Sequence, residues 1–120
     1  MGGKSSSDLL VLQKSMRLVD EIYRLTNRFP MSEECCLISK VRRAAVSIPS
    51  NIAEGQARNH AREFRQFLSI ALGSLAEPET QLEISIRIEI LSPAEFEEIR
   101  LTSQEIGRML HDLSSSIKHI

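Results

Sequence analysis

Apolar residues recur along most of the chain at steps of three and four, the spacing that gathers them on one face of an α-helix. Residues that favour turns, Phe29-Pro30 and Gly55 among them, separate four such stretches. The predicted helices cover residues 8–28, 32–54, 59–91 and 92–120.

Two of these helices have a single clear apolar face. In the second helix the residues expected to point inward are Leu37, Val41, Ala45, Ile48 and Ile52. In the fourth helix a regular heptad is expected to do the same, with Phe96, Ile99, Ser103, Ile106, Leu110, Leu113, Ile117 and Ile120.

The first helix carries two apolar stripes rather than one. The stripe interpreted as the core-facing seam steps regularly by three and four and consists of Leu9, Leu12, Met16, Val19, Tyr23 and Thr26. The second stripe consists of Val11, Leu18, Ile22 and Leu25. A bundle with one core needs only one of them.

Residues 82–90 alternate strictly between apolar and polar, which is strand periodicity. A single strand would have no ladder partner, because nothing else in the chain alternates for as long, so a helix is preferred. On a helix, Leu82, Ile86 and Ile90 share one face. The opposite side then carries Ile84, Ile88 and Leu91.

The surplus stripes have two interpretations, a broad core face or contacts with partner subunits. The second is preferred, and it predicts an oligomer interface at Leu18, Ile22, Leu25, Ile84, Ile88 and Leu91.

Local signals define how several helices start and bend. Ser92-Pro93-Ala94-Glu95 predicts a capping box at the start of the fourth helix. Pro49 predicts a bend, with Ser47, Ser50 and Asn51 available to bond the carbonyls that it frees. Pro78 predicts a kink or break near residues 74–78.

The predicted fold is all-α: an antiparallel up-down-up-down four-helix bundle that assembles as a homo-oligomer. Residues 1–7 are interpreted as a flexible leader and residues 8–120 as the bundle domain. At 120 residues, with 42% hydrophobic and 26% charged residues, the composition is that of an ordinary globular domain. No apolar run is long enough to span a bilayer, so a cytoplasmic protein without membrane contact is expected.

No enzyme, metal or cofactor is predicted. The only cysteines are the neighbours Cys35 and Cys36, which suit neither a disulfide framework nor a zinc site. The paired Glu-x-x-His motifs of a di-iron bundle are absent, and no G-x-S-x-G elbow occurs. A site in the central channel of an oligomer stays open as an alternative.

The net charge of −1 hides an uneven distribution. Six cations fall within residues 40–65: Lys40, Arg42, Arg43, Arg58, Arg62 and Arg65. Such a cluster can bind nucleic-acid phosphates without sequence preference. The alternative is a solvated face, or salt bridges between subunits that pair the cluster with the acidic segment that starts at Glu95.

The run Arg42–Gly55, RRAAVSIPSNIAEG, closely resembles the bacterial four-helix-bundle family encoded by 23S rRNA intervening sequences. The similarity continues through Glu63-Phe64, Ile70–Leu75 and Glu79–Leu82, and it covers roughly residues 9–113.

This resemblance implies a homopentamer. It also implies kinship with the accessory variability protein of diversity-generating retroelements, which works with a reverse transcriptase and nucleic acid. The hypotheses are therefore RNA binding through the six cations or, alternatively, a protein-interaction adaptor. Within the signature run, the residues expected to shape the bend and the turn are Pro49, Ser50, Asn51, Glu54 and Gly55.

Overall fold

The computed structural model describes residues 6–117, apart from the side chains of Glu34 and Cys35. Within this range every regular element is helical and no strand forms. The α-helices are α1 (Ser6–Thr26), α2 (Ser39–Ala57), α3 (Ala61–Ser74), α4 (Ala76–Arg87) and α5 (Pro93–Ser116). Two short turns, η1 (Met31–Glu33) of 3₁₀ type and η2 (Glu34–Ile38) of π type, lead into α2.

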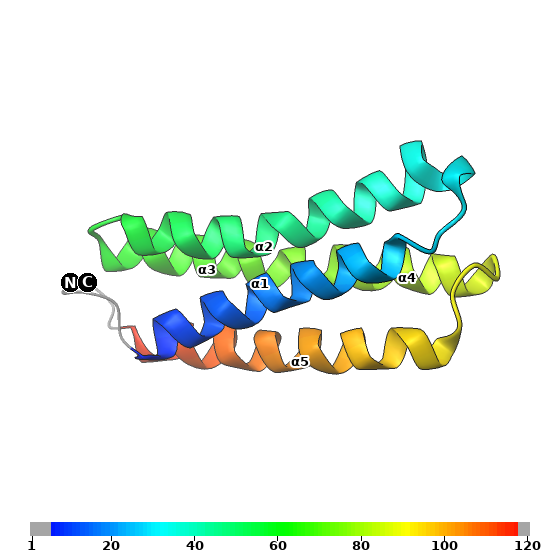
Figure 1. Ribbon diagram of the computed structural model, residues 1–120. Helices are drawn as coiled ribbons and strands as arrows, with labels where there is room; N and C mark the ends of the chain where they lie inside the picture. Colours follow the sequence, from blue (N-terminus) through cyan, green and yellow to red (C-terminus); the bar gives the residue numbers. More distant parts are fainter. Residues whose placement is uncertain (1–5, 118–120) are drawn as a thin grey trace.

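The five α-helices make four rods, because α3 and α4 follow each other along one line (Figure 1). The chain travels the length of the molecule in α1, returns in α2, travels out again in α3 and α4, and returns in α5 (Figure 1). The helix α1 therefore begins at the same end of the molecule at which α5 finishes. The molecule measures 48 × 24 × 18 Å along its principal axes.

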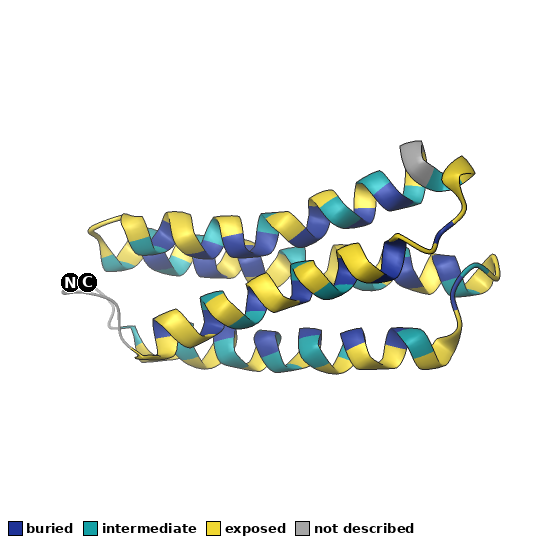
Figure 2. Cartoon of the chain, in the orientation of Figure 1, coloured by how far each residue is buried: buried dark blue, intermediate teal, exposed yellow. Residues whose placement is uncertain are grey.

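The predicted inward faces of the second and fourth helices are confirmed for most of their length (Figure 2). Leu37 is only half-buried, as are Leu113 and Ile117 at the far end of the heptad, and Ile120 lies outside the described residues. The buried members are Val41, Ala45, Ile48, Ile52, Phe96, Ile99, Ser103, Ile106 and Leu110.

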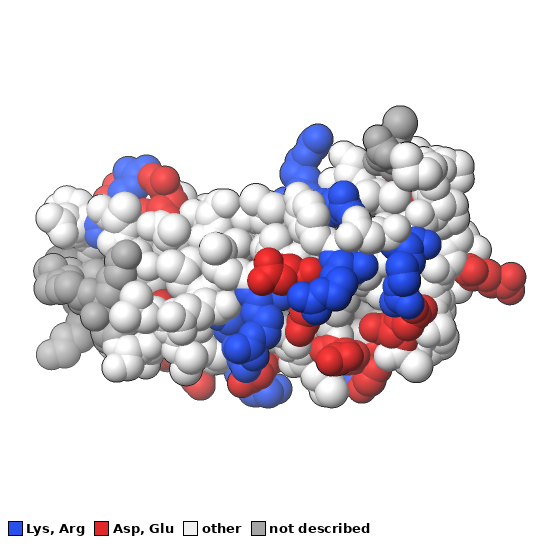
Figure 3. Space-filling model, in the orientation of Figure 1, with Lys and Arg blue, Asp and Glu red and all other residues white. Residues whose placement is uncertain are grey.

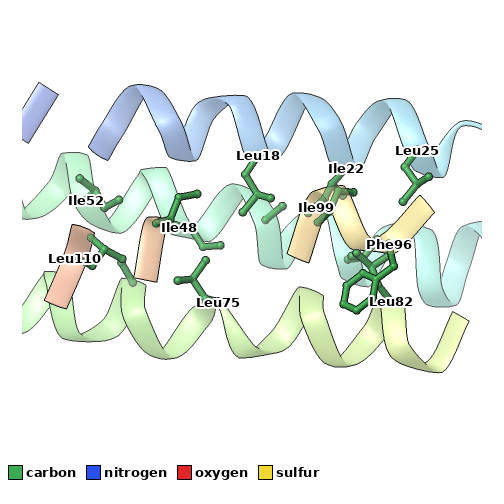
Figure 4. Close-up of a cluster of buried hydrophobic side chains, with 14 of the residues drawn as sticks. Leu18, Ile22, Leu25, Ile48, Ile52, Leu75, Leu82, Phe96, Ile99 and Leu110 are labelled. Carbon is green, nitrogen blue, oxygen red and sulfur yellow. The ribbon is translucent and has the colours of Figure 1, made fainter. Parts of the chain in front are cut away.

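The two stripes on α1 were assigned to the wrong sides of the helix: the stripe expected to contact other subunits faces the core. Leu18 and Ile22 are fully buried and Leu25 is 8% exposed, and all three point from α1 into the bundle (Figure 4). The stripe expected to face the core instead leaves Met16 56% and Tyr23 40% exposed. Both stripes repeat at heptad spacing, so periodicity alone favours neither of them.

The third predicted helix is broken, as expected, within residues 74–78. Leu75 ends α3 and also precedes α4, and its N–H bonds the carbonyls of Leu72 and Gly73 instead of continuing the regular ladder. Pro78 stands in the first turn of α4, where a missing N–H does no harm. The break thus lies about one turn before Pro78. In an unbroken helix the proline ring would clash there with the carbonyl four residues earlier.

Residues 82–87 are helical, which confirms that the alternating segment is no strand. The helix ends at Arg87, however, and Glu89 adopts a left-handed conformation with φ of 66°. The Glu89 N–H bonds the carbonyl of Ile86, and the Ile90 N–H bonds that of Ser85, both at 3.0 Å. This is the Schellman pattern, which usually has glycine where this chain has Glu89.

Replacing Glu89 by glycine is expected to raise the free energy of unfolding by about 0.5–1 kcal/mol, because glycine adopts positive φ without a Cβ penalty. Thermal and urea unfolding measure the gain. The same substitution at Glu83, an exposed position within α4, is the control and is expected to lower stability by about 1 kcal/mol. A loss of stability in Glu89→Gly would contradict the assignment of this turn.

The predicted capping box at the start of α5 is present in full. The Ser92 hydroxyl accepts from the Glu95 N–H at 3.2 Å, and the Glu95 carboxylate accepts from the Ser92 N–H at 3.0 Å. Pro93 occupies the first helical position. These signals act within four residues, so they need no tertiary information.

The signature run forms the body of α2. The helix continues through Pro49, and the side chains of Ser50 and Asn51 each donate to the carbonyl four residues earlier, at 2.8 and 2.7 Å. Gly55 was expected to end the helix, but α2 runs on to Ala57. Gly55 is instead buried against α3, where an added Cβ would stand 2.8 Å from the Phe67 Cβ.

Candidate interaction surfaces

The six cations of residues 40–65 do not form one cluster. Lys40, Arg42 and Arg43 lie in the first turns of α2, whereas Arg58, Arg62 and Arg65 lie at its far end and in α3. Arg43 and Arg58 are fifteen residues apart, which is about 22 Å along a helix at 1.5 Å per residue. The predicted continuous basic surface is therefore two separate groups at opposite ends of the α2 rod.

Arg42 fastens the end of α1 to α2. Its Nε donates to the Thr26 hydroxyl at 2.9 Å, and its guanidinium also donates to the Asn27 side chain at 2.9 Å and to the Tyr23 carbonyl at 3.3 Å. The guanidinium carbon lies 4.5 Å from the centroid of the Tyr23 ring. A cation that bonds the last carbonyls of a helix stabilises that helix end, so the contacts of Arg42 are structural.

Replacing Arg42 by alanine is expected to lower the free energy of unfolding by about 1–2 kcal/mol, because one half-buried hydrogen bond, two exposed ones and a ring contact are lost together. Arg43→Ala is the control, since Arg43 is exposed and has no ion pair within residues 6–117, and it should change stability by less than about 0.5 kcal/mol. Equal unfolding midpoints for the two variants would contradict the role given to Arg42.

Two of the cations near the α2–α3 connection also have partners inside the chain. Arg58 bonds Glu54 at 2.9 Å, lies 3.8 Å from Glu63, and has its guanidinium carbon 5.2 Å from the centroid of the Phe67 ring. Arg65 is half-buried and donates to the carbonyl of Ile117 at 3.4 Å. Glu54 thus contributes to the turn by holding Arg58, which is the C-terminal capping residue of α2.

The remaining three predicted phosphate contacts, Lys40, Arg43 and Arg62, are exposed. None of them makes an ion pair with another described residue. They are separated along the molecule, because Arg62 lies at the start of α3 and the other two at the start of α2.

The acidic residues of α5 pair with cations outside residues 40–65. Arg28 contacts Glu95 at 2.6 Å, and Lys14 contacts Glu105 at 3.1 Å. Hydrogen bonds from the Ser92 backbone and hydroxyl, helped by Arg28, hold the pKa of Glu95 below its ordinary value. On the face that Figure 3 displays, basic and acidic side chains are accordingly intermixed.

A charged crevice of about 510 Å³ surrounds the Arg28–Glu95 pair. Its lining residues come from the end of α1 and the start of α5 and include Glu21, Arg24 and Glu98. Among the described residues, no group of three or more His, Cys, Asp or Glu is arranged to hold a metal ion. Cys36 is exposed, and the side chain of Cys35 lies outside the described part.

A second hollow, of about 380 Å³, lies between α1 and α2 and has no charged residue in its lining. We call it the α1/α2 groove, and it is lined by Leu12, Met16, Val19, Val46, Pro49, Ser50 and Ala53. One wall comes from the regular seam of α1, in which Leu12 and Val19 are half-buried against the core and Met16 is exposed. The sequence pattern that could have predicted this groove is therefore the regular stripe of α1, which the sequence analysis assigns to the core.

The predicted oligomer interface is only partly on the surface. Leu18, Ile22, Leu25 and Leu91 are buried within the protomer, so they are unable to contact another copy, and their assignment was wrong. Ile84 and Ile88 are 42% and 48% exposed. We call these two residues the α4 ridge.

Residues 7–112 match the sequence profile of the 23S rRNA-intervening sequence proteins. The chain belongs to this family. The resemblance seen in RRAAVSIPSNIAEG is thereby confirmed, and the family match spans all four rods of the bundle.

A solved structure supports the family assignment. It is the crystal structure of a protein of unknown function from the S23 ribosomal protein family of Bacteroides thetaiotaomicron. The two chains share 27% sequence identity with a TM-score of 0.80, and the match covers 92% of this chain and 99% of that one. No curated protein matches the sequence. No helix in residues 6–117 of this family member has the length and apolar character needed to cross a membrane.

Proposed function

We propose that this chain is a non-enzymatic protomer of a bacterial, cytoplasmic homo-oligomer of antiparallel four-helix bundles. The observation that carries the proposal is the α1/α2 groove, an apolar surface that the protomer covers only in part and that leaves Met16 and Val46 exposed. Exposed apolar grooves mark interaction sites in soluble proteins, and a heptad seam is a surface that packs against another helix. The family resemblance favours a pentamer.

Light scattering of the purified chain tests the proposal, and a mass several times that of the protomer is expected. Met16→Glu combined with Val46→Glu places two charges in the groove and should lower the mass to that of a monomer. Leu101→Glu is the control, because Leu101 is 52% exposed on α5 and belongs to neither surface defined above. A monomeric parent protein at micromolar concentration would overturn the proposal.

RNA binding is a second candidate function, favoured by three exposed cations without an intramolecular ion pair. In a cyclic oligomer these three cations are repeated in each copy, so the assembly presents several local positive patches although the net charge of each protomer is −1. The residues proposed to contact phosphates are now Lys40, Arg43 and Arg62, because Arg42, Arg58 and Arg65 already have partners within the chain.

Binding to a structured RNA, measured at several salt concentrations, tests this candidate. Replacing Lys40, Arg43 and Arg62 by alanine should flatten the slope of log K against log salt by about 2–3. The control replaces Arg17, Arg24 and Arg108, which are also exposed. An unchanged slope would rule out these contacts, and RNA-independent capture of another polypeptide would favour the protein-interaction adaptor instead.

A further inference from the structure

We infer that the charged crevice between α1 and α5 binds a small aliphatic diamine, with one ammonium group at each wall and the carbon chain across the floor. The crevice is separate from the α1/α2 groove, so this inference goes beyond the proposed function. Its walls come from the last turns of α1 and the first turns of α5, which lie at the same end of the molecule (Figure 1). The volume of about 510 Å³ lies within the range of small-molecule sites in proteins.

The crevice has an apolar floor and a charged rim. Leu25 and Ile99 form the floor and are 8% and 5% exposed. Three carboxylates and two guanidinium groups stand around them, those of Glu21, Glu95, Glu98, Arg24 and Arg28. Three negative and two positive charges leave the lining with a net charge of −1, so it favours a cation over an anion.

One pair of these charges is already satisfied within the protomer. The Arg28 guanidinium lies 2.6 Å from the Glu95 carboxylate, which also accepts from the Ser92 N–H. The carboxylates that remain are Glu21 on α1 and Glu98 on α5, so one stands on each wall. Neither of them forms an ion pair with another described residue.

The Glu21 carboxylate is the group that most needs a partner. Its side chain is half-buried in the wall, and Oε1 is buried without a hydrogen bond from any described residue. Withdrawing a carboxylate from water without a donor or a countercharge is costly, and buried groups of this kind are paired in most native proteins. An ammonium group supplies both the donor and the countercharge.

The spacing of the two free carboxylates favours an organic cation with two ends. Glu21 and Glu98 belong to different helices, and the apolar floor lies in the same crevice. A chain with a nitrogen at each end pairs with both carboxylates and lays its methylene groups on Leu25 and Ile99. Arg24 is exposed at the rim and is able to turn into solvent when the cation binds.

Isothermal titration calorimetry of the full chain with hexamethylenediamine at low salt tests the inference. We expect one diamine per protomer, with a Kd below about 1 mM. Hexamethonium is the matched ligand, because it has the same carbon chain and charge but its nitrogens carry methyl groups in place of N–H donors. It should bind about tenfold more weakly. The absence of saturable binding, or equal affinity for the two ligands, would overturn the inference.

Two neutral substitutions locate the binding site. Glu21→Gln should weaken diamine binding by about tenfold, and Glu98→Gln by about threefold because that carboxylate is exposed. Glu83→Gln is the control, since Glu83 is exposed on α4 and lies outside the crevice, and it should leave the Kd unchanged. An unchanged Kd in Glu21→Gln would overturn the inference.

The effect of Arg24→Ala tests the sign of the ligand's charge. Removing this cation should tighten diamine binding by about threefold, because a like charge no longer opposes the ligand. Weaker binding in Arg24→Ala would show that Arg24 takes part in holding the ligand and would overturn the inference. Circular dichroism and light scattering check that each variant keeps the helicity and mass of the parent protein. The titration gives its result for a monomer and an oligomer alike, so its failure would leave the proposed self-assembly standing.

Discussion

Replacing Leu18 by alanine is expected to lower the free energy of unfolding by about 3 kcal/mol. Leu18 has no exposed surface and lies among the core side chains contributed by α1 (Figure 4). Its truncation removes apolar contacts and leaves a cavity that the surrounding rods fill only in part. Chemical unfolding followed by circular dichroism measures the loss, which should appear as a lower midpoint with an unchanged slope.

Met16→Ala is the matched control, two residues away on the same helix. Met16 is 56% exposed, so within the protomer its truncation should change stability by less than about 0.5 kcal/mol. Any larger effect should depend on protein concentration, because it would report the loss of a subunit contact rather than a core contact. Similar, concentration-independent losses in both variants would contradict the assignment of the two α1 seams.

The second large effect is expected at Gly55. Alanine there gains about 1 kcal/mol in helix propensity, yet its Cβ would stand 2.8 Å from the Phe67 Cβ and 3.1 Å from the Phe64 Cδ1. The first of these atoms is fixed to the α3 backbone, so α2 and α3 must separate. We expect a net loss of about 1–3 kcal/mol in the free energy of unfolding, measured by urea denaturation.

Gly73→Ala serves as the control for this substitution. Gly73 lies within α3, where an added Cβ meets no atom within 4 Å. Only the propensity gain remains, and the variant should be more stable by up to about 1 kcal/mol. The two alanine variants therefore shift the unfolding midpoint in opposite directions, and a shared direction would show that close packing at Gly55 does not limit the fold.

Features that depend on a few neighbouring residues were predicted well from the sequence. The capping box at Ser92 and the break before Pro78 follow from short-range chemistry, and both are present. The helical state of residues 82–87 also followed, since a solitary strand would have no hydrogen-bond partner.

Features that depend on which surface meets which were predicted less well. Both stripes of α1 are apolar at the same spacing, and the choice between them depends on how α2 and α5 approach. The tight approach at Gly55 was missed for the same reason, because glycine near a helix end is more often a terminator.

The basic cluster was misjudged because proximity in sequence was taken for proximity in space. Lys40 and Arg65 are close in number, but a helix of 19 residues lies between their groups and carries them apart. The partners of Arg42 come from residues 23–27, which lie across a loop and two short turns. No local pattern at Arg42 reveals that it is already engaged.

The position of the α1 start and the α5 finish at one end of the rods has a practical consequence for engineered fusions (Figure 1). In a cyclic assembly whose rods run along its axis, any cargo joined before α1 or after α5 would crowd onto a single side of the assembly. The opposite side, where Lys40 and Arg43 lie, would stay clear of that cargo. A reporter attached at either terminus should therefore leave those two lysine and arginine side chains accessible in every copy.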